Sequence, residues 1–272
     1  MKAGKLALLF MVALVVFFSL APFLWFVLTS FKSPIEVTSI PPKLIPDGTS
    51  YFYRSAIFKY NLLKYVKNSA LIASATTVIT ITISVFASYS ISRINLPFKR
   101  VILASLLLVS MFPQISIAGP VWRILQSLGW LNTYRGLIIP YITLTLPLGV
   151  WILTSYFNEL PQDLERAAMV DGCGYIGGLF RVILPLSYPG VFTAAILVFI
   201  YAWNEFFFAL LIMTQKDMQP LSVGIALFQG QYTLPWGELA AASTVATLPL
   251  VLIVFLFQKR IIGGLSAGAI KG

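Results

Sequence analysis

Six long apolar runs dominate the chain and restrict what it can fold into. About 20 helical residues cross roughly 30 Å of hydrocarbon, and each run reaches about that length with few or no charges. Only 10% of the 272 residues are charged, whereas charged residues make up about a quarter of a soluble domain. We therefore predict an all-α integral membrane protein in one transmembrane domain over residues 1–272, with six spans near residues 6–31, 68–92, 101–122, 136–157, 189–213 and 239–258.

The first run has some features of a secretory signal, because Lys2 and Lys5 precede it. It is longer than the usual apolar core of a signal, and Pro22 to Phe26 continue it without a small-residue cleavage site. Cleavage is the alternative, but retention as the first transmembrane helix is favoured.

The distribution of Lys and Arg slightly favours one orientation of the chain in the membrane. If both termini and the even-numbered loops face the cytoplasm, ten Lys and Arg lie inside and nine outside. The short basic connector "RINLPFKR" at 93–100 carries most weight, because positive charge in short loops marks the cytoplasmic side. The expected layout places both termini in the cytoplasm.

Several function classes are excluded by what the sequence lacks. It contains no histidine and no G-x-x-x-x-G-K-[ST], so it has no histidine-based catalytic or zinc site and no phosphate-binding loop of that type. The net charge of +10 is scattered through the loops, which argues against nucleic acid as a partner. We expect neither catalysis nor a bound metal or cofactor in this chain.

One polar insert, residues 158–188, interrupts this apolar chain. It holds four of the nine acidic residues and a G-x-G-x-x-G at Gly172, Gly174 and Gly177. A dinucleotide loop needs a strand before these glycines, but "QDLERAAMV" is a helix-forming sequence. We instead predict helices near 162–171 and 174–182 with a glycine C-cap between them. Physics alone leaves two alternatives open, a docking element for a partner groove or an ordinary amphipathic loop.

The segment "LERAAMVDGCGYIGGLFRVILPLSYPG" resembles the cytoplasmic coupling loop, or EAA loop, of type I ATP-binding-cassette (ABC) importer permeases. Two positions depart from that pattern: Arg166 stands where the family has glutamate, with Glu165 beside it, and Cys173 replaces a small residue. The resemblance implies that this loop couples the permease to ATPase subunits through Glu165, Arg166, Ala167, Ala168, Asp171, Gly172, Leu184 and Pro185.

The resemblance extends over nearly the whole chain and is closest to the carbohydrate group of MalG-like maltose permeases. "YVKNSALIA", "IPYITLTLPL", "YAWNEF" and the terminal "GGLSAGAIKG" carry it. It implies a non-catalytic subunit of an ATP-driven sugar importer in a prokaryotic inner membrane. The implied partners are a second, distinct MalF-like permease, two cytosolic ATPase subunits that bind ATP and Mg, an extracytoplasmic solute-binding protein, membrane lipid and a sugar. The sugar is expected to be a disaccharide, an oligosaccharide or a glucoside.

Polar residues within the spans are candidates for the sugar path. An ionisable group inside a span is costly and therefore a functional candidate, which singles out Glu205 with its neighbours Trp203 and Asn204. The structural alternative is that Glu205 binds a polar group of another helix. Ser110 and Gln114 are further candidates.

Residues 214–238 form the last substantial loop, which is external in the expected layout. "LFQGQYTLPWGE" resembles the family region that reaches toward the binding protein, with Gln229, Gly230 and Gln231 at its tip. A plain surface turn is the alternative.

The alternative to an ATP-driven importer is an ion-gradient-driven secondary transporter with Glu205 as its coupling acid.

Overall fold

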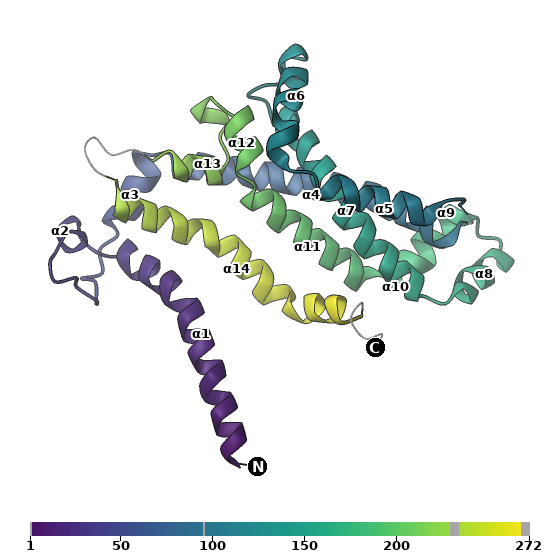
Figure 1. The fold of residues 1–272 in the computed structure, drawn as a ribbon, viewed down its shortest axis with the longest axis horizontal. Helices are drawn as coiled ribbons and strands as arrows, with labels where there is room; N and C mark the ends of the chain where they lie inside the picture. The colour runs from purple at the N-terminus through teal and green to yellow at the C-terminus, as the bar shows by residue number, and fades with distance from the viewer. Residues whose placement is uncertain (1, 95, 229–233, 268–272) are drawn as a thin grey trace. The chain divides into compact units, whose positions relative to one another are not determined.

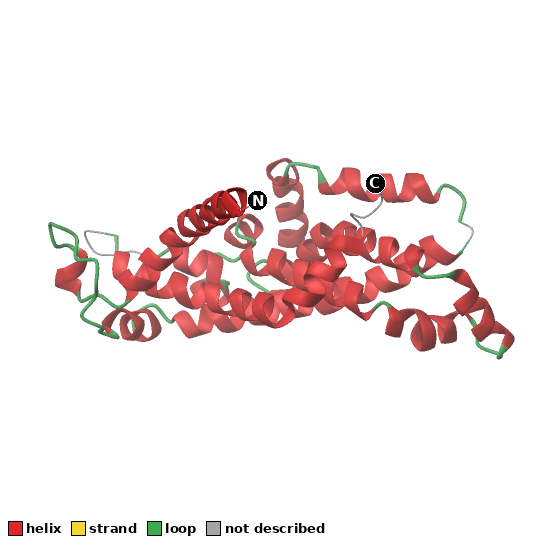
Figure 2. Cartoon of the chain, turned by 90° about the horizontal axis from the view of Figure 1, so that it is seen from below, coloured by secondary structure: helices red, strands yellow, loops and turns green. Residues whose placement is uncertain are grey.

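In the computed structural model, which describes residues 2–94, 96–228 and 234–267, every regular element is a helix (Figure 2). The helices are α1 (Lys2–Ser30), α2 (Pro34–Val37), α3 (Tyr51–Phe58), α4 (Leu62–Arg93), α5 (Lys99–Ser110), α6 (Gln114–Ser127), α7 (Tyr134–Glu159), α8 (Gln162–Val170), α9 (Tyr175–Gly178), the π-helix η1 (Leu179–Ile183), α10 (Leu184–Leu186), α11 (Tyr188–Asn204), α12 (Phe207–Ile212), the 3₁₀ turn η2 (Lys216–Met218), α13 (Leu221–Ala226) and α14 (Trp236–Ala267). The predicted all-α class is confirmed.

Four helical segments are long and apolar enough to cross a membrane on length and composition: Gly4–Ser30, Leu62–Arg93, Tyr134–Glu159 and Trp236–Gln258. They match the first, second, fourth and sixth predicted spans. Counting each of two bent helix pairs as one span gives up to six among the described residues. The count of six therefore stays a prediction.

The third and fifth predicted spans are not continuous helices. α5 and α6 meet at 89°, where Pro113 has an extended backbone and disfavours a helical residue before it. The predicted fifth span breaks at Glu205, after which α12 begins. α11 instead pairs with the helical stretch Tyr175–Leu186 across a bend of 80°.

The chain divides into two compact units, residues 1–66 with 224–250 and residues 67–223 with 251–272. In the first unit, aromatic side chains of residues 51–66 pack against the second chain segment. Tyr60 stacks on Phe228 with ring centroids 4.3 Å apart, and the ring of Phe52 leaves no room for a side chain at Gly237. Ser55 donates a hydrogen bond of 2.9 Å to Glu238.

The second unit packs α4, α7, η1 and α11 around one apolar core. Small and hydroxyl residues allow α4 and α7 to approach closely, as in membrane helix pairs: a Cβ on Gly149 would lie 2.5 Å from Ser84 Oγ, and Ser88 donates to the Val150 carbonyl at 2.9 Å. α8 and α9 lie at one end of this unit (Figure 1). The core consists of Val85, Tyr89, Leu153, Phe157, Leu179, Ile183 and Ala194.

Candidate functional site

The insert at 158–188 has the predicted helix–glycine–helix form. α8 ends in a two-bond C-cap, in which the N–H of Cys173 donates to Ala168 at 2.9 Å and that of Gly172 donates to Met169 at 3.0 Å. Gly172 has φ of +86°, a conformation that glycine adopts at little cost. The element before the glycines is a helix and not a strand, which removes the basis for a dinucleotide-binding loop.

The second half of the insert returns to the membrane-spanning part through an irregular helix. η1 is a π-helix over Leu179–Ile183, and Pro185 follows it directly. Proline has no N–H to donate to the carbonyl four residues earlier, and its ring crowds that carbonyl. The wider π turn relieves this crowding while Leu179 and Ile183 stay buried in the core of the second unit.

Glu165 is buried and anchors the insert to α4. Its Oε1 accepts a hydrogen bond from the Tyr89 hydroxyl, and its Oε2 lies 3.2 Å from Nε of Arg93. Arg93 also donates to the carbonyl of Leu160 at 3.1 Å, and the Tyr89 hydroxyl lies 3.0 Å from the Tyr175 carbonyl oxygen. Tyr89, Glu165 and Arg93, here called the anchor triad, thereby fix both α8 and α9 to one end of α4.

Sequence reasoning missed Tyr89 and Arg93. The available signal was Arg93 itself, the first basic residue after a long apolar span. It was counted only as a topology charge, yet its side chain is 3% exposed. A buried cation requires an anionic partner, and the nearest acid-rich segment of the sequence is the insert.

The opposite side of the insert is exposed and partly apolar. Arg166 lies on this side and contacts Asp163 at 3.2 Å, with both side chains open to solvent. The four large exposed apolar residues on α8 and α9 are Leu164, Val170, Tyr175 and Ile176, with Val170 87% exposed. Among the predicted coupling residues, Arg166, Ala167, Asp171, Gly172 and Pro185 are exposed, Ala168 and Leu184 are half-buried, and Glu165 is buried.

Glu205 is also buried, and its carboxylate caps a helix. Its two carboxylate oxygens accept hydrogen bonds from the N–H groups of Phe208 at 2.8 Å and Ala209 at 3.1 Å, in the first turn of α12. The Tyr141 hydroxyl of α7 donates to Oε2 at 2.5 Å, and Ser222 donates to the Glu205 carbonyl at 2.8 Å. These contacts match the structural alternative given for Glu205, with a neighbouring helix as partner.

The break after α11 opens a recess of about 440 Å³ lined by Gln114, Ile200, Tyr201, Asn204, Glu205, Phe206 and Phe207. Gln114 of α6 donates to the Tyr201 hydroxyl at 2.7 Å across it. Asn204 is exposed and holds the Ile200 carbonyl at 2.8 Å. The recess thus combines amide, phenol and aromatic groups, and Tyr201 is a member that the sequence analysis did not select.

The remaining predicted residues lie elsewhere. Trp203 is buried and stacks on Phe199 with centroids 5.7 Å apart. Ser110 is exposed and donates to the Leu107 carbonyl at 2.7 Å. Gln229, Gly230 and Gln231 fall outside the described residues. The described part of the chain contains no group of three His, Cys, Asp or Glu side chains that could hold a metal ion.

Comparison with known proteins gives the class of this molecule. Residues 80–266 match the family described as binding-protein-dependent transport system inner membrane component, and the chain belongs to that family. Members of the family are permease subunits, so the protein is a membrane transport subunit and not an enzyme, as predicted. The family does not support the alternative of an ion-gradient-driven secondary transporter.

Relatives are similar over almost their full lengths. The trehalose/maltose transport system permease protein MalG of Thermococcus litoralis is 45% identical over 93% of this chain and 92% of its own. The sulfoquinovosyl glycerol transport system permease protein SmoH of Agrobacterium fabrum is 41% identical over 93% and 89%. The trehalose transport system permease protein SugB of Mycobacterium tuberculosis is 40% identical over 95% of both.

Solved structures share the fold. A chain of a bacterial ABC transporter that imports the acidic polysaccharide alginate superposes with a TM-score of 0.82 and 19% identity, over 95% of this chain and 96% of that one. A chain of a bacterial alginate ABC transporter in complex with a periplasmic protein that carries an alginate pentasaccharide gives 0.69 and 14%, over 94% and 93%. These likenesses confirm the importer-permease fold.

Proposed function

We propose that the protein is the MalG-like permease subunit of an ATP-driven, binding-protein-dependent importer of a disaccharide, oligosaccharide or glucoside. The observation that carries this proposal is the coupling-loop form of residues 158–188 in a chain of this family. The names of relatives at 40–45% identity support a sugar substrate, since two of them transport trehalose or trehalose and maltose.

In this proposal the exposed side of the insert docks into a groove of a cytosolic ATPase subunit. An amphipathic helix that places apolar side chains in a partner groove is a common recognition mode, and Val170, Tyr175 and Ile176 are available for it. Arg166 and Asp171 provide exposed charged groups on the same insert. Glu165 acts indirectly, because its contacts with Tyr89 and Arg93 join the docked loop to α4.

The other partners follow from the same assignment. A second, distinct MalF-like permease completes the translocation path, and two ATPase subunits bind ATP and Mg. A solute-binding protein delivers sugar from the extracytoplasmic side, where we place residues 229–231. Both termini are cytoplasmic in this layout, which the weak excess of positive charge in the short loops supports.

We further propose that sugar passes the recess at the end of α11. Gln114 and Asn204 offer amide groups for sugar hydroxyls, and Phe206 and Phe207 offer apolar faces. Glu205 contributes by holding α12 in place, since its carboxylate is occupied by Tyr141 and two backbone N–H groups. Trp203 and Ser110 are left with supporting roles on the same path.

The complex with its genomic neighbours tests the proposal. Reconstituted in vesicles, it should take up labelled disaccharide only with ATP and binding protein, and binding protein should stimulate ATP hydrolysis. Ile176→Asp should abolish binding of the ATPase subunits, because it places a charge in the groove. Phe58→Asp is the matched control, since Phe58 is 81% exposed and lies outside the insert. Sugar uptake driven by an ion gradient without ATPase subunits would refute the proposal.

A further inference from the structure

Lys32 is a buried lysine just beyond the end of α1. Its side chain is almost fully enclosed, with the residue 3% exposed. Nζ lies 4.3 Å from the ring centroid of Trp25. No carboxylate among the described residues forms an ion pair with it. A buried cation is stable when an anion completes its surroundings, and the ring of Trp25 supplies only part of that.

The lysine lines a recess of about 360 Å³ in the first unit. Trp25 and Phe26 form one wall, and Trp236 at the start of α14 also lines it. The polar members include Thr29, whose buried Oγ1 has no hydrogen-bond partner among the described residues. The recess therefore offers one cation, three aromatic rings and one hydroxyl without a partner among the described residues, beside the carboxylate of Glu36.

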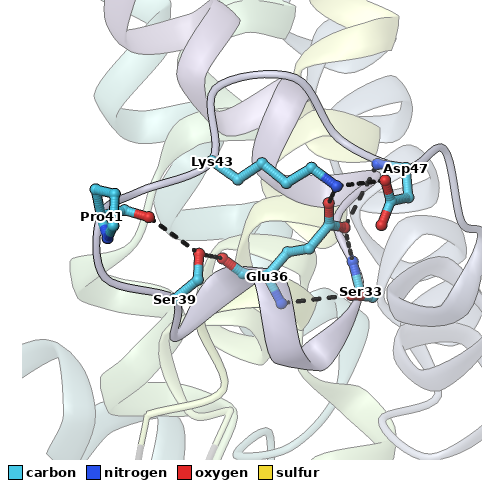
Figure 3. Close-up of polar contacts among 6 residues, drawn as sticks. All are labelled: Ser33, Glu36, Ser39, Pro41, Lys43 and Asp47. Atoms are coloured by element: carbon cyan, nitrogen blue, oxygen red, sulfur yellow. Dashed lines mark hydrogen bonds and ion pairs between the residues drawn. The ribbon is translucent and has the colours of Figure 1, made fainter.

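Glu36 also lines the recess, but its carboxylate is bound by Lys43 and by the backbone of Ser33 (Figure 3). Oε1 of Glu36 lies 2.7 Å from Nζ of Lys43, and Oε2 accepts from the backbone N–H of Ser33 at 2.7 Å. Lys43 also contacts Asp47. Lys43 is shared between Glu36 and Asp47, and no ion pair joins Glu36 to Lys32, so Lys32 is the cation of this recess without an ion-pair partner among the described residues.

The recess lies at the boundary of a membrane span. α1 contains the 27-residue segment Gly4–Ser30, whose apolar side chains are not buried by the rest of the chain. Trp25 and Phe26 occupy its last turns, and Lys32 follows its last residue by two positions. Tryptophan and lysine at the end of a span are typical of the headgroup level of a bilayer, where phosphate is the abundant anion.

We propose that this recess binds a phospholipid, with its phosphate on Lys32 and Thr29 and its glycerol and upper acyl chains against Trp25, Phe26 and Trp236. Lys32 donates to the phosphate oxygens, and Thr29 Oγ1 donates a second hydrogen bond. The phosphate gives Lys32 the ion-pair partner that it does not have among the described residues, and the lipid covers the last turns of α1. This inference concerns the permease itself and stands independently of which sugar it carries.

Native mass spectrometry of the full chain in detergent tests the proposal. The probes are phosphatidylglycerol and diacylglycerol with the same acyl chains. We expect the protein to retain the phospholipid preferentially, and Lys32→Met to lower its affinity about fivefold, the size of one lysine's attraction to an anionic headgroup. Lys59→Met is the matched control, because Lys59 is an exposed lysine over a Tyr60 ring at 5.1 Å in the same unit. Lys32→Arg should bind as the natural protein does.

Several results would overturn the assignment. Equal retention of both lipids, or unchanged retention in Lys32→Met, would remove the phosphate contact. Competition by inorganic phosphate at equal concentration would indicate a free-anion site and not a lipid site. Loss of the lipid when the second permease is co-purified would show that a protein covers the recess. If Lys32→Met does not fold, Trp236→Ala carries the test, since this ring is 58% exposed and its truncation should weaken binding without unfolding the chain.

Discussion

Glu165 and Glu205 are both buried carboxylates, but they stabilise different parts of the structure through different partners. Both accept a hydrogen bond from a tyrosine hydroxyl of a membrane-spanning helix, Tyr89 in one case and Tyr141 in the other. Glu165 pairs with the guanidinium of Arg93 on a different element. Glu205 instead pairs with N–H groups three and four residues ahead of it.

The two carboxylates differ in how far along the sequence most of their partners lie. The anchor triad joins residues more than 70 positions apart and fixes a projecting loop to α4. In the proposed function it carries movement of that loop to α4. The Glu205 contacts stabilise the first turn of α12 directly after the end of α11, and their main effect is local. Substitutions at the two sites should therefore separate loss of coupling from loss of local structure.

The largest effect is expected for Glu165→Ala. It leaves Arg93 buried without its carboxylate, and breaking a buried pair in this way costs about 3–5 kcal/mol of unfolding free energy. ATP hydrolysis in the assembled complex should no longer respond to binding protein. Denaturant unfolding of the purified chain measures the first quantity and ATPase assays the second.

Asp163→Ala is the control for that variant. Asp163 belongs to the exposed ion pair with Arg166, and exposed pairs contribute about 0–1 kcal/mol. If Glu165→Ala and Asp163→Ala were equally stable and equally coupled, the anchor triad would have no role in transmission.

A smaller and purely local effect is expected for Glu205→Gln. The amide keeps one oxygen that can accept from the first turn of α12 but loses the other, so about 1–3 kcal/mol of unfolding free energy should be lost. Sugar uptake per folded complex should stay within about twofold of the natural protein, because the charge is used inside the chain. A loss of sugar uptake without a loss of stability would indicate that the charge of Glu205 acts directly on the sugar.

Gly172→Ala should destabilise by about 1–2 kcal/mol, the cost of a left-handed backbone for a residue with a Cβ. Nothing lies within 4 Å of the position where that Cβ would be, so the effect is conformational and not a clash. Gly174→Ala is the matched control, because Gly174 has φ of −75° and equal space. Hydrogen exchange of α8 and α9 would detect the difference, and equal exchange in both variants would contradict the assigned cap.

The smallest effect concerns a third carboxylate, which lies outside the spans. Hydrogen bonding to Lys43, and then to the Ser33 backbone, lowers the pKa of Glu36 from its ordinary 4.5 to about 2. Because the folded pKa is lowered, this contribution to stability is complete above about pH 4.5. It is lost as the pH falls from there toward 2.

Thermal unfolding of the natural chain and of Glu36→Gln across pH 2.5–6 checks this prediction. The difference in melting temperature between the two should be constant near pH 6 and should shrink below about pH 4.5. A difference that grows on acidification would contradict the assigned cause.

Much of the fold could be predicted because apolar runs and helix-capping signals are local. Span positions follow from run length, and the helix–glycine–helix form of the insert follows from helix formers, Gly172 and Pro185. The breaks at Pro113 and Glu205 were not predicted. Proline is tolerated in many membrane helices, and the break at Glu205 depends on Tyr141 and Ser222, which are distant in sequence.

The sequence predicted which segment forms the candidate site, but not which of its side chains are buried and which are exposed. The glycine spacing and the acidic composition identified residues 158–188, and the family resemblance named both Glu165 and Arg166 as coupling residues without showing which of them is buried. Adjacent helical residues point about 100° apart, so one can be buried while the other is exposed. Which of them turns inward was decided by the buried guanidinium of Arg93, on a helix that ends 72 positions earlier in the chain.

By itself the sequence determined that this protein is a helical membrane chain with one polar insert of helix–glycine–helix form, because hydrophobicity, helix propensity and glycine caps act within a few residues. Only the tertiary structure decided which carboxylates hold the chain together, where the spans bend and which lysine lacks a counter-ion. Those properties depend on charges and hydroxyl groups that meet across helices, and a buried charge takes its role from the partner that folding brings to it.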